Sequence, residues 1–110
     1  MKNIELIKEL DFSGAIRAEK DIEVKELFSG VNRRIVEVKL LKNKILTKHK
    51  AAEPITVFCL AGSGIFLAGK DLEEKQTLTS GTLITLEAGI EHEVSAEPEI
   101  HLLVTKFKGT

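Results

Sequence analysis

Apolar and polar residues alternate along the middle of the chain. Val36, Val38 and Leu40 fall on one face of an extended backbone, whereas Glu37 and Lys39 fall on the other. A period of two is typical of a β-strand that has one face buried and the other toward water. The pattern therefore predicts a half-buried strand at this point of the chain.

Further short apolar runs follow, and residues that favour turns separate them. In the first run, Ile45, Thr47 and His49 share one face. Pro54 cannot donate a backbone hydrogen bond, so it belongs at the start of a strand. The run after it is apolar on both faces, which predicts a strand that is covered on both sides. The predicted strands are residues 36–40, 45–49, 55–61, 65–68, 72–78, 82–86, 90–95 and 100–107, with turns at 42–44, 51–54, 62–64, 69–71, 87–89 and 96–99.

The number and spacing of these runs indicate the fold class. Eight or nine short strands, with a turn signal every ~8–12 residues, are typical of an all-β sandwich or barrel. Strands and helices do not alternate along the sequence, so a nucleotide-binding parallel sheet is not expected. The sequence contains no fixed-period repeat and no shift of composition that would mark a second domain.

The N-terminal part of the chain has a weaker pattern. Ile4, Ile7 and Leu10 are three residues apart, a spacing that predicts one or two helical turns docked on the rest of the protein. Residues 15–28 fit either a strand or a helical turn, and the pattern favours a strand. We therefore expect an N-terminal segment, residues 1–31, that packs on or pairs with a barrel formed by residues 32–110.

Composition narrows the function classes. Of 110 residues, 43% are hydrophobic and 30% charged, and the net charge is −1, so no overall field favours nucleic acid or a membrane as partner. The sequence has no Trp or Tyr, and thus few aromatic platforms for single-stranded nucleic acid. The first residues lack the apolar core of a signal peptide, and a single cysteine fits a reducing compartment. We therefore expect a cytoplasmic protein.

The candidate chemistry rests on three histidines, because imidazole binds metals and carries protons near neutral pH. His49 precedes the doubly apolar strand, His92 follows a glycine turn, and His101 lies in the last strand. Cys59 lies in an apolar run and is expected to pack as a small apolar residue. Nucleophile-elbow, P-loop, H-E-x-x-H and paired-cysteine motifs do not occur. A basic cluster is expected to be a solvated face; it comprises Lys42, Lys44, Lys48 and Lys50.

From about residue 34 to 107 the sequence resembles a small single-domain cupin, on two motifs. The first motif of that family has two histidines one residue apart, then a glutamate, then a strand that ends in a glycine turn. Here the strand and its glycine turn are ITVFCLAGSG. His49 is at the first histidine position and Ala51 at the second, and Glu53 lies next to the glutamate position. The second motif, a glycine, a short strand, a turn and a histidine, is matched by residues 81–92 and ends in His92.

The resemblance implies a double-stranded β-helix, or jelly-roll, barrel with a short N-terminal helical or irregular segment. It also implies an interior site at His49 and His92, which would be the metal ligands if a divalent Fe, Zn, Mn or Ni ion is bound. Two of the four usual ligands are present, and Glu53 or His101 are the candidates to complete the set. A catalytic ion normally has three or four protein ligands.

Two functions remain open from the sequence. The barrel binds a small molecule, with His49, His92, Glu53 and His101 as candidate ligand-binding residues, or it is a small metal-dependent enzyme of dioxygenase or isomerase type. The missing ligands favour the first. Unpaired strand edges in a short jelly roll also predict a homodimer.

Overall fold

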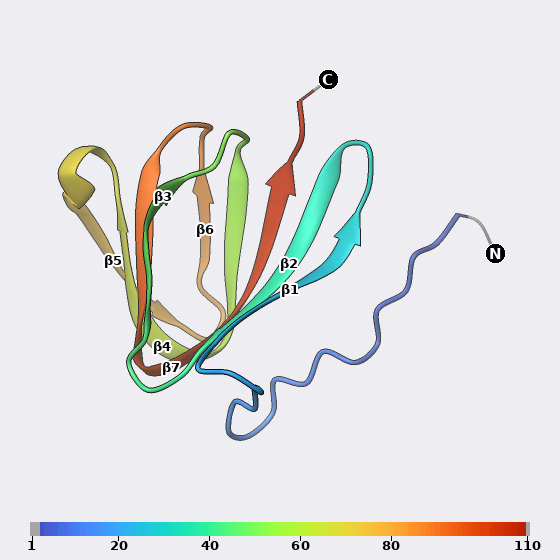
Figure 1. The fold of residues 1–110 in the computed structure, drawn as a ribbon, viewed down its shortest axis with the longest axis horizontal. Coiled ribbons are helices and arrows are strands. Elements are labelled where there is room, and N and C mark those ends of the chain that lie inside the picture. Colours follow the sequence, from blue (N-terminus) through green and yellow to red (C-terminus); the bar gives the residue numbers. More distant parts are fainter. Residues whose placement is uncertain (1–2, 110) are drawn as a thin grey trace.

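The computed structural model describes residues 3–109, which form one antiparallel sheet rolled into a barrel (Figure 1). The all-β prediction is confirmed, and the regular helical structure within residues 3–109 is one short 3₁₀ turn. The sheet order is β1-β2-β7-β4-β5, with β3 also paired to β7 and β6 to β4. The elements are β1 (Ile22–Ser29), β2 (Arg33–Leu40), β3 (Ile45–Lys50), β4 (Ile55–Ala68), η1 (Lys70–Leu72), β5 (Glu74–Thr79), β6 (Leu83–Leu86) and β7 (Glu91–Phe107).

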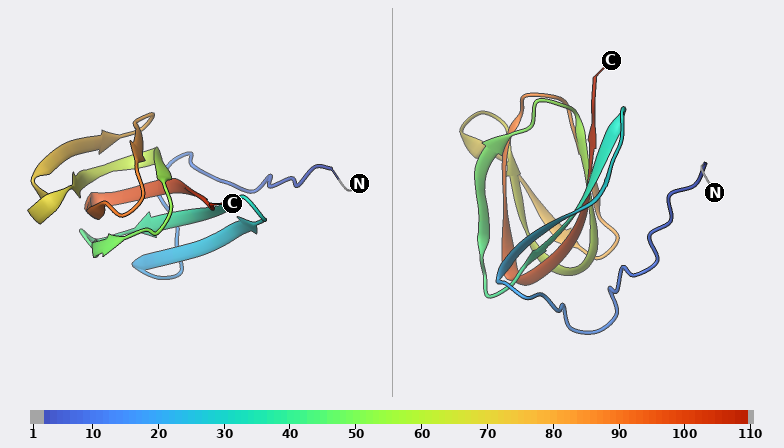
Figure 2. Two further views of the ribbon diagram at one scale, coloured as in Figure 1. Left: turned by 90° about the horizontal axis from the view of Figure 1, so that it is seen from above. Right: turned by 45° about the vertical axis from the view of Figure 1, so that its right-hand side comes forward.

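Two long strands, β4 and β7, hold the barrel together. They pair antiparallel from Ile55–Lys106 at one end to Ala68–His92 at the other. The first part of β4 pairs with β6 and its second part with β5. The second part of β7 pairs with β2 and its first part with β3. Each long strand therefore runs through both walls, and the two views of Figure 2 show the sheet folding over on itself.

Both long strands bend where the sequence pattern predicted turns. Residues 62–64 and 96–99 are continuous strand instead, and the β4–β7 register shifts between Cys59 and Ala61 and again between Gly62 and Gly64. Such shifts bend a strand and increase its twist. The two turn predictions were therefore wrong, and the eight or nine predicted strands are seven within residues 3–109.

The bend requires glycine because the two backbones lie very close together. A Cβ atom on Gly62 would lie 2.2 Å from the carbonyl oxygen of Glu99, and one on Gly64 would lie 2.2 Å from that of Ser95. Gly62 also has φ of 80°, a conformation that glycine adopts at little cost. The same GSG residues that suggest a turn in the sequence thus permit a sharply bent strand.

An irregularity in β3 changes which of its residues face the barrel interior. Leu46 is opposite Val94 and His49 is opposite His92, so three steps along β3 match two along β7. One extra residue in a strand is a β-bulge, which reverses the alternation beyond it. Leu46 therefore shares the interior face with His49, and the prediction that Ile45 does so was wrong; Ile45 is 44% exposed.

The hydrophobic core fills the barrel interior, with inward side chains from both walls. In β4 the inward residues are buried and the outward ones mostly half-buried, so that strand is only partly covered on its outer side. The buried core residues are Val36, Val38, Leu40, Ile55, Val57, Cys59, Phe66, Ala68, Leu78, Val94, Ala96, Ile100 and Leu102.

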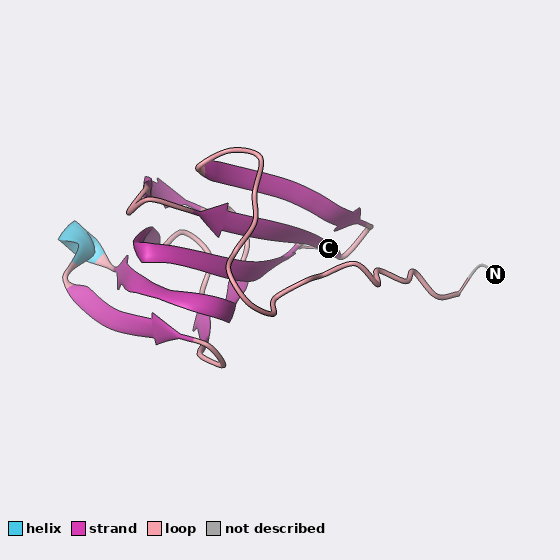
Figure 3. Ribbon diagram, turned by 90° about the horizontal axis from the view of Figure 1, so that it is seen from below, coloured by secondary structure: helices cyan, strands magenta, loops and turns pink. Residues whose placement is uncertain are grey.

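The N-terminal segment crosses the outer surface of the sheet without regular structure, as Figure 3 shows. The Lys39 ammonium donates to the carbonyl oxygen of Arg17 at 2.8 Å, and the Ile16 N–H donates to a Glu99 carboxylate oxygen at 3.1 Å. The predicted helical turns at residues 3–10 were wrong, and the irregular alternative holds. So short a helix needs a surface to dock on, and Leu6 remains 72% exposed.

The ambiguous stretch at residues 15–28 divides in two. Its first part is irregular, and a strand, β1, begins at Ile22 and pairs with β2. The strand alternative is therefore the correct one for its second part.

Within residues 3–109 there is no helix with the length and apolar content needed to cross a membrane.

The close approach at the bend gives a stability prediction. We expect Gly62→Ala to lower the free energy of unfolding by about 3–5 kcal/mol, because the new methyl group would force the two strands apart. Gly89 is the matched control, because its φ is also 80° and a Cβ atom there would have no other atom within 4 Å. Gly89→Ala should lower the free energy of unfolding by only about 1–2 kcal/mol, the cost of the left-handed backbone alone. Urea unfolding of both variants measures the difference, and equal losses would contradict the argument.

The homodimer stays a prediction, and the exposed N-terminal segment shows where to test it. Ile4, Leu6 and Phe12 are 70%, 72% and 56% exposed, and a second copy of the chain would cover such side chains. We expect light scattering at micromolar concentration to give a dimer mass. Ile4→Asp with Leu6→Asp should shift it toward the monomer, whereas Lys8→Ala should not. A monomer mass for the unaltered protein would contradict the prediction.

Candidate functional site

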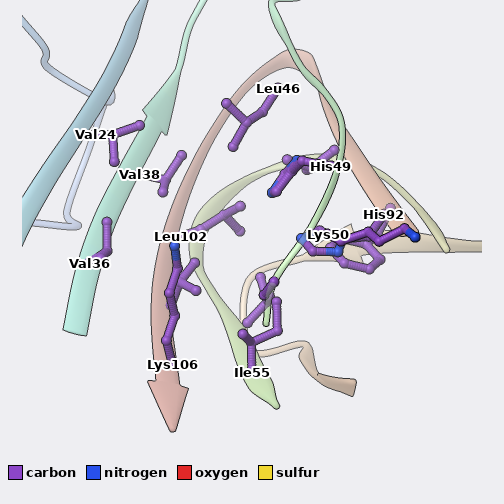
Figure 4. Close-up of a pocket in the computed structure, with 15 residues that line it drawn as sticks. Val24, Val36, Val38, Leu46, His49, Lys50, Ile55, His92, Leu102 and Lys106 are labelled. Carbon is purple, nitrogen blue, oxygen red and sulfur yellow. The ribbon is translucent and has the colours of Figure 1, made fainter. Parts of the chain in front are cut away.

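A pocket opens between the two walls of the barrel, with a cavity volume of about 110 Å³. Its walls are mainly branched apolar side chains, including Val36 and Val38 from β2 and Leu102 and Val104 from β7. These residues line one side because they alternate on the inward face of adjacent strands. Figure 4 shows Val24, Val36 and Val38 on one side of the pocket and the two histidines on the other.

His49 and His92 meet at the polar end of this pocket. They are opposite one another in the β3–β7 pairing, and their ring centroids are 4.1 Å apart with the rings inclined by 63°. The ring of Phe66 stacks on His92 with centroids 5.8 Å apart and planes 11° from parallel. The β3–β7 pairing and the stacked Phe66 ring together fix the position of the His92 ring.

Both imidazoles have the same tautomer when neutral. Nδ1 of His49 lies 2.8 Å from the carbonyl oxygen of Thr47, and Nδ1 of His92 lies 3.0 Å from that of Ile90. A carbonyl oxygen only accepts hydrogen bonds, so each Nδ1 carries the proton. Each Nε2 is then left with its lone pair, available to a ligand or to a metal.

The two rings differ in exposure. His49 is exposed at the pocket mouth, whereas His92 is only 4% exposed. Burial lowers the pKa of His92 below its usual value, and the nearby His49 and Lys106 lower it further, against the opposing effect of the hydrogen bond to Ile90. His92 is therefore a neutral imidazole at pH 7.

Two lysines complete the polar lining. Lys50 follows His49 at the end of β3, and Lys106 lies on β7 on the same face as Leu102 and Val104. Sequence reasoning assigned Lys50 to a solvated face and did not identify Lys106. The alternation in the last strand could have identified Lys106, because it is two residues after Val104 and four after Leu102, which both face inward.

The other two predicted site residues do not line the pocket. Glu53 is half-buried in the loop before β4. His101 is fully buried on the opposite face of the sheet, where its Nε2 lies 2.6 Å from a carboxylate oxygen of Glu37. That face follows from the register, because His101 alternates with the inward-facing Leu102 and lies opposite Lys39.

Cys59 lies inside the barrel core and is fully buried. Burial raises the pKa of its thiol. The thiol also donates a weak hydrogen bond to the carbonyl oxygen of Ala61. A neutral, buried thiol is a poor nucleophile, which agrees with the expectation that Cys59 packs as a small apolar residue.

The pocket residues do not form the donor set of a resident catalytic metal ion. At 4.1 Å between centroids, the two imidazoles are close enough to share one ion. However, within residues 3–109 no three side chains of His, Cys, Asp or Glu come together in metal-binding geometry. Catalytic ions in proteins normally need three or more such ligands.

The fold is that of the cupins, which confirms the resemblance noted from the motifs. A cupin superfamily protein from Desulfitobacterium hafniense superposes with a TM-score of 0.76 at 12% identity, covering 86% of this chain and 84% of its own. An RmlC-like cupin protein from Desulfovibrio desulfuricans gives 0.74 at 19% identity, covering 91% and 95%.

A third similar structure matches nearly end to end. It is a conserved protein of unknown function from Streptococcus pyogenes, with a TM-score of 0.75 at 16% identity over 98% of both chains. No protein-family model and no curated protein matches the sequence. At these identities the comparisons define the fold, and the site must be interpreted from its own residues.

The pKa of His92 gives a prediction for stability against pH. Its folded-state pKa lies below the usual value of 6.5, so the unfolded chain takes up a proton first as the pH falls. Stability is therefore fully present above pH 6.5 and decreases as the pH drops from there toward the folded-state pKa. We expect urea midpoints measured between pH 7.5 and 5 to fall less for His92→Asn than for the unaltered protein. Parallel curves for the two proteins would contradict the assignment.

Proposed function

We propose that this protein binds a small molecule inside the barrel, with its apolar part against the valine-rich wall and its polar part at His49 and His92. The observation that carries the proposal is the pocket itself, apolar over most of its lining with polar side chains gathered at one end. Such a combination is typical of small-molecule sites, where the apolar lining supplies affinity and a few polar groups fix orientation.

The dimensions limit the size of the ligand. A closed apolar cavity of about 150 Å³ can hold benzene. The pocket has about 110 Å³ and opens to solvent beside the exposed His49. A branched aliphatic group of four or five carbons suits the interior, with a polar group near the two imidazoles.

A metal-dependent enzyme of dioxygenase or isomerase type has one observation in its favour. Both imidazoles donate through Nδ1 to backbone carbonyls, the arrangement in which histidine binds a metal through Nε2. The donor count argues against it, because two imidazoles leave most positions of a catalytic ion without a protein ligand. We therefore favour binding over metal-dependent turnover.

A titration followed by methyl NMR tests the binding function. The probes are isoamyl alcohol, isovaleramide and isovalerate, which share one branched body and differ in the polar group. We expect at least one to shift the methyl signals of Val57 and Leu102 saturably while leaving Leu83, which is 62% exposed and does not line the pocket, unchanged. Val57→Phe, which fills the cavity, should abolish the shift of the Leu102 methyl signals, and Leu83→Phe should not.

Two results would overturn the proposal. If no probe moves the pocket methyl groups, the barrel does not bind molecules of this size. If the purified protein holds close to one Fe, Zn, Mn or Ni ion per chain, and His92→Ala loses it, the metal-dependent alternative is correct.

A further inference from the structure

The polar side chains that line the pocket are all basic. They are His49, Lys50, His92 and Lys106, and within residues 3–109 no Asp or Glu lines the pocket together with them. This composition is unusual beside the whole chain, in which 17 acidic residues slightly outnumber 16 Lys and Arg. The pocket therefore has a local positive charge that the rest of the molecule does not share.

The two lysines come from different strands and approach the same end of the pocket. Lys50 follows directly after His49, whose ring contacts His92. Lys106 lies on the far part of β7, and its charge nevertheless acts on His92. Figure 4 shows His49, Lys50 and His92 together and Lys106 on the strand that lines the adjoining side. The pocket therefore has one lysine beside the two histidines and a second on the wall formed by the last part of β7.

Among residues 3–109, no carboxylate pairs with either of these two lysines. Glu91, opposite Lys50 in the strand pairing, forms its ion pair with Lys48 instead, at 3.5 Å. Within residues 3–109, neither Lys50 nor Lys106 has a carboxylate oxygen within 4.0 Å. A ligand with a negative charge would complete the site, because the half-buried Lys106 gains more from an anionic partner than a fully solvated lysine does.

We propose that the pocket binds a small carboxylic acid as its anion, with the carboxylate between Lys50 and Lys106 beside His49 and His92, and a short branched hydrocarbon body against the valine-rich wall. This inference rests on the proposed binding function and specifies its ligand class. A carboxylate fits better than a phosphate ester, because phosphate sites commonly add arginine forks, helix N-termini or glycine-rich backbone donors to their lysines. Among the described residues, none of these lines the pocket.

Matched probes test the charge preference. Isovalerate and isovaleramide have the same body, so their affinities, measured by calorimetry in a phosphate-free amine buffer at pH 7.5, isolate the carboxylate. We expect isovalerate to bind at least about tenfold more tightly, as charge-assisted hydrogen bonds to lysine imply. Lys106→Met and Lys50→Met keep the aliphatic stem and should each weaken isovalerate binding severalfold without changing isovaleramide binding. Lys75→Met, an exposed lysine on β5 outside the pocket, should change neither.

The outcomes separate this inference from the function on which it rests. Equal affinity for acid and amide, or an equal effect of Lys75→Met and Lys106→Met, would overturn the carboxylate proposal and leave the binding function standing. Failure of every probe to bind would overturn both. Inorganic phosphate binding as tightly as isovalerate would overturn the carboxylate class, because the site would then recognise anions without regard to the hydrocarbon body.

Discussion

The close backbone contact between β4 and β7 at their shared bend is the constraint on which the barrel depends. Side chains at Gly62 and Gly64 would collide with the carbonyl oxygens of Glu99 and Ser95. That contact lets two strands of 14 and 17 residues turn from one wall into the other while their pairing continues on both sides of the bend. At the corner itself the register shifts, and the Ser63 hydroxyl donates to the carbonyl oxygen of Glu97 at 2.6 Å, which gives that backbone group a partner where the ladder is interrupted.

The bend also creates the site. The first part of β7 carries His92 and the second part carries Leu102 and Lys106. In a straight strand, residues ten or more positions apart would lie over 30 Å from one another, since each residue adds about 3.3 Å. Folding the strand at its middle turns both inward faces toward one cavity. The pocket is therefore a direct consequence of the corner, and a substitution that opens the corner would also separate the polar end of the site from its apolar wall.

The sequence was sufficient to predict the fold class, which follows from alternation and turn spacing, and the resemblance to the cupin motifs implied that His49 and His92 meet. It was insufficient wherever the conformation of a short segment depends on a strand that is distant in the sequence. The GSG segment looks like a turn, and only the opposite strand, far along the chain, makes it a bend. The bulge in β3 has no local mark, so simple alternation predicts Ile45 on the inner face with His49 where the structure has Leu46. Lys50 is exposed, as expected of the basic cluster, but the cluster gave no sign that this lysine also borders the pocket.

The two buried histidines show how the environment determines what an imidazole can do. His101 has a carboxylate from Glu37 at 2.6 Å, so its Nε2 is already engaged, and its ring does not line the pocket. His92 has a carbonyl oxygen on Nδ1, an aromatic ring on its face and positive neighbours. The buried hydrogen bond between His101 and Glu37 contributes to structure, because removing either partner would leave a buried polar group alone. A neutral imidazole among lysines has no such internal partner, so its remaining nitrogen and the surrounding charge are directed toward whatever enters the cavity.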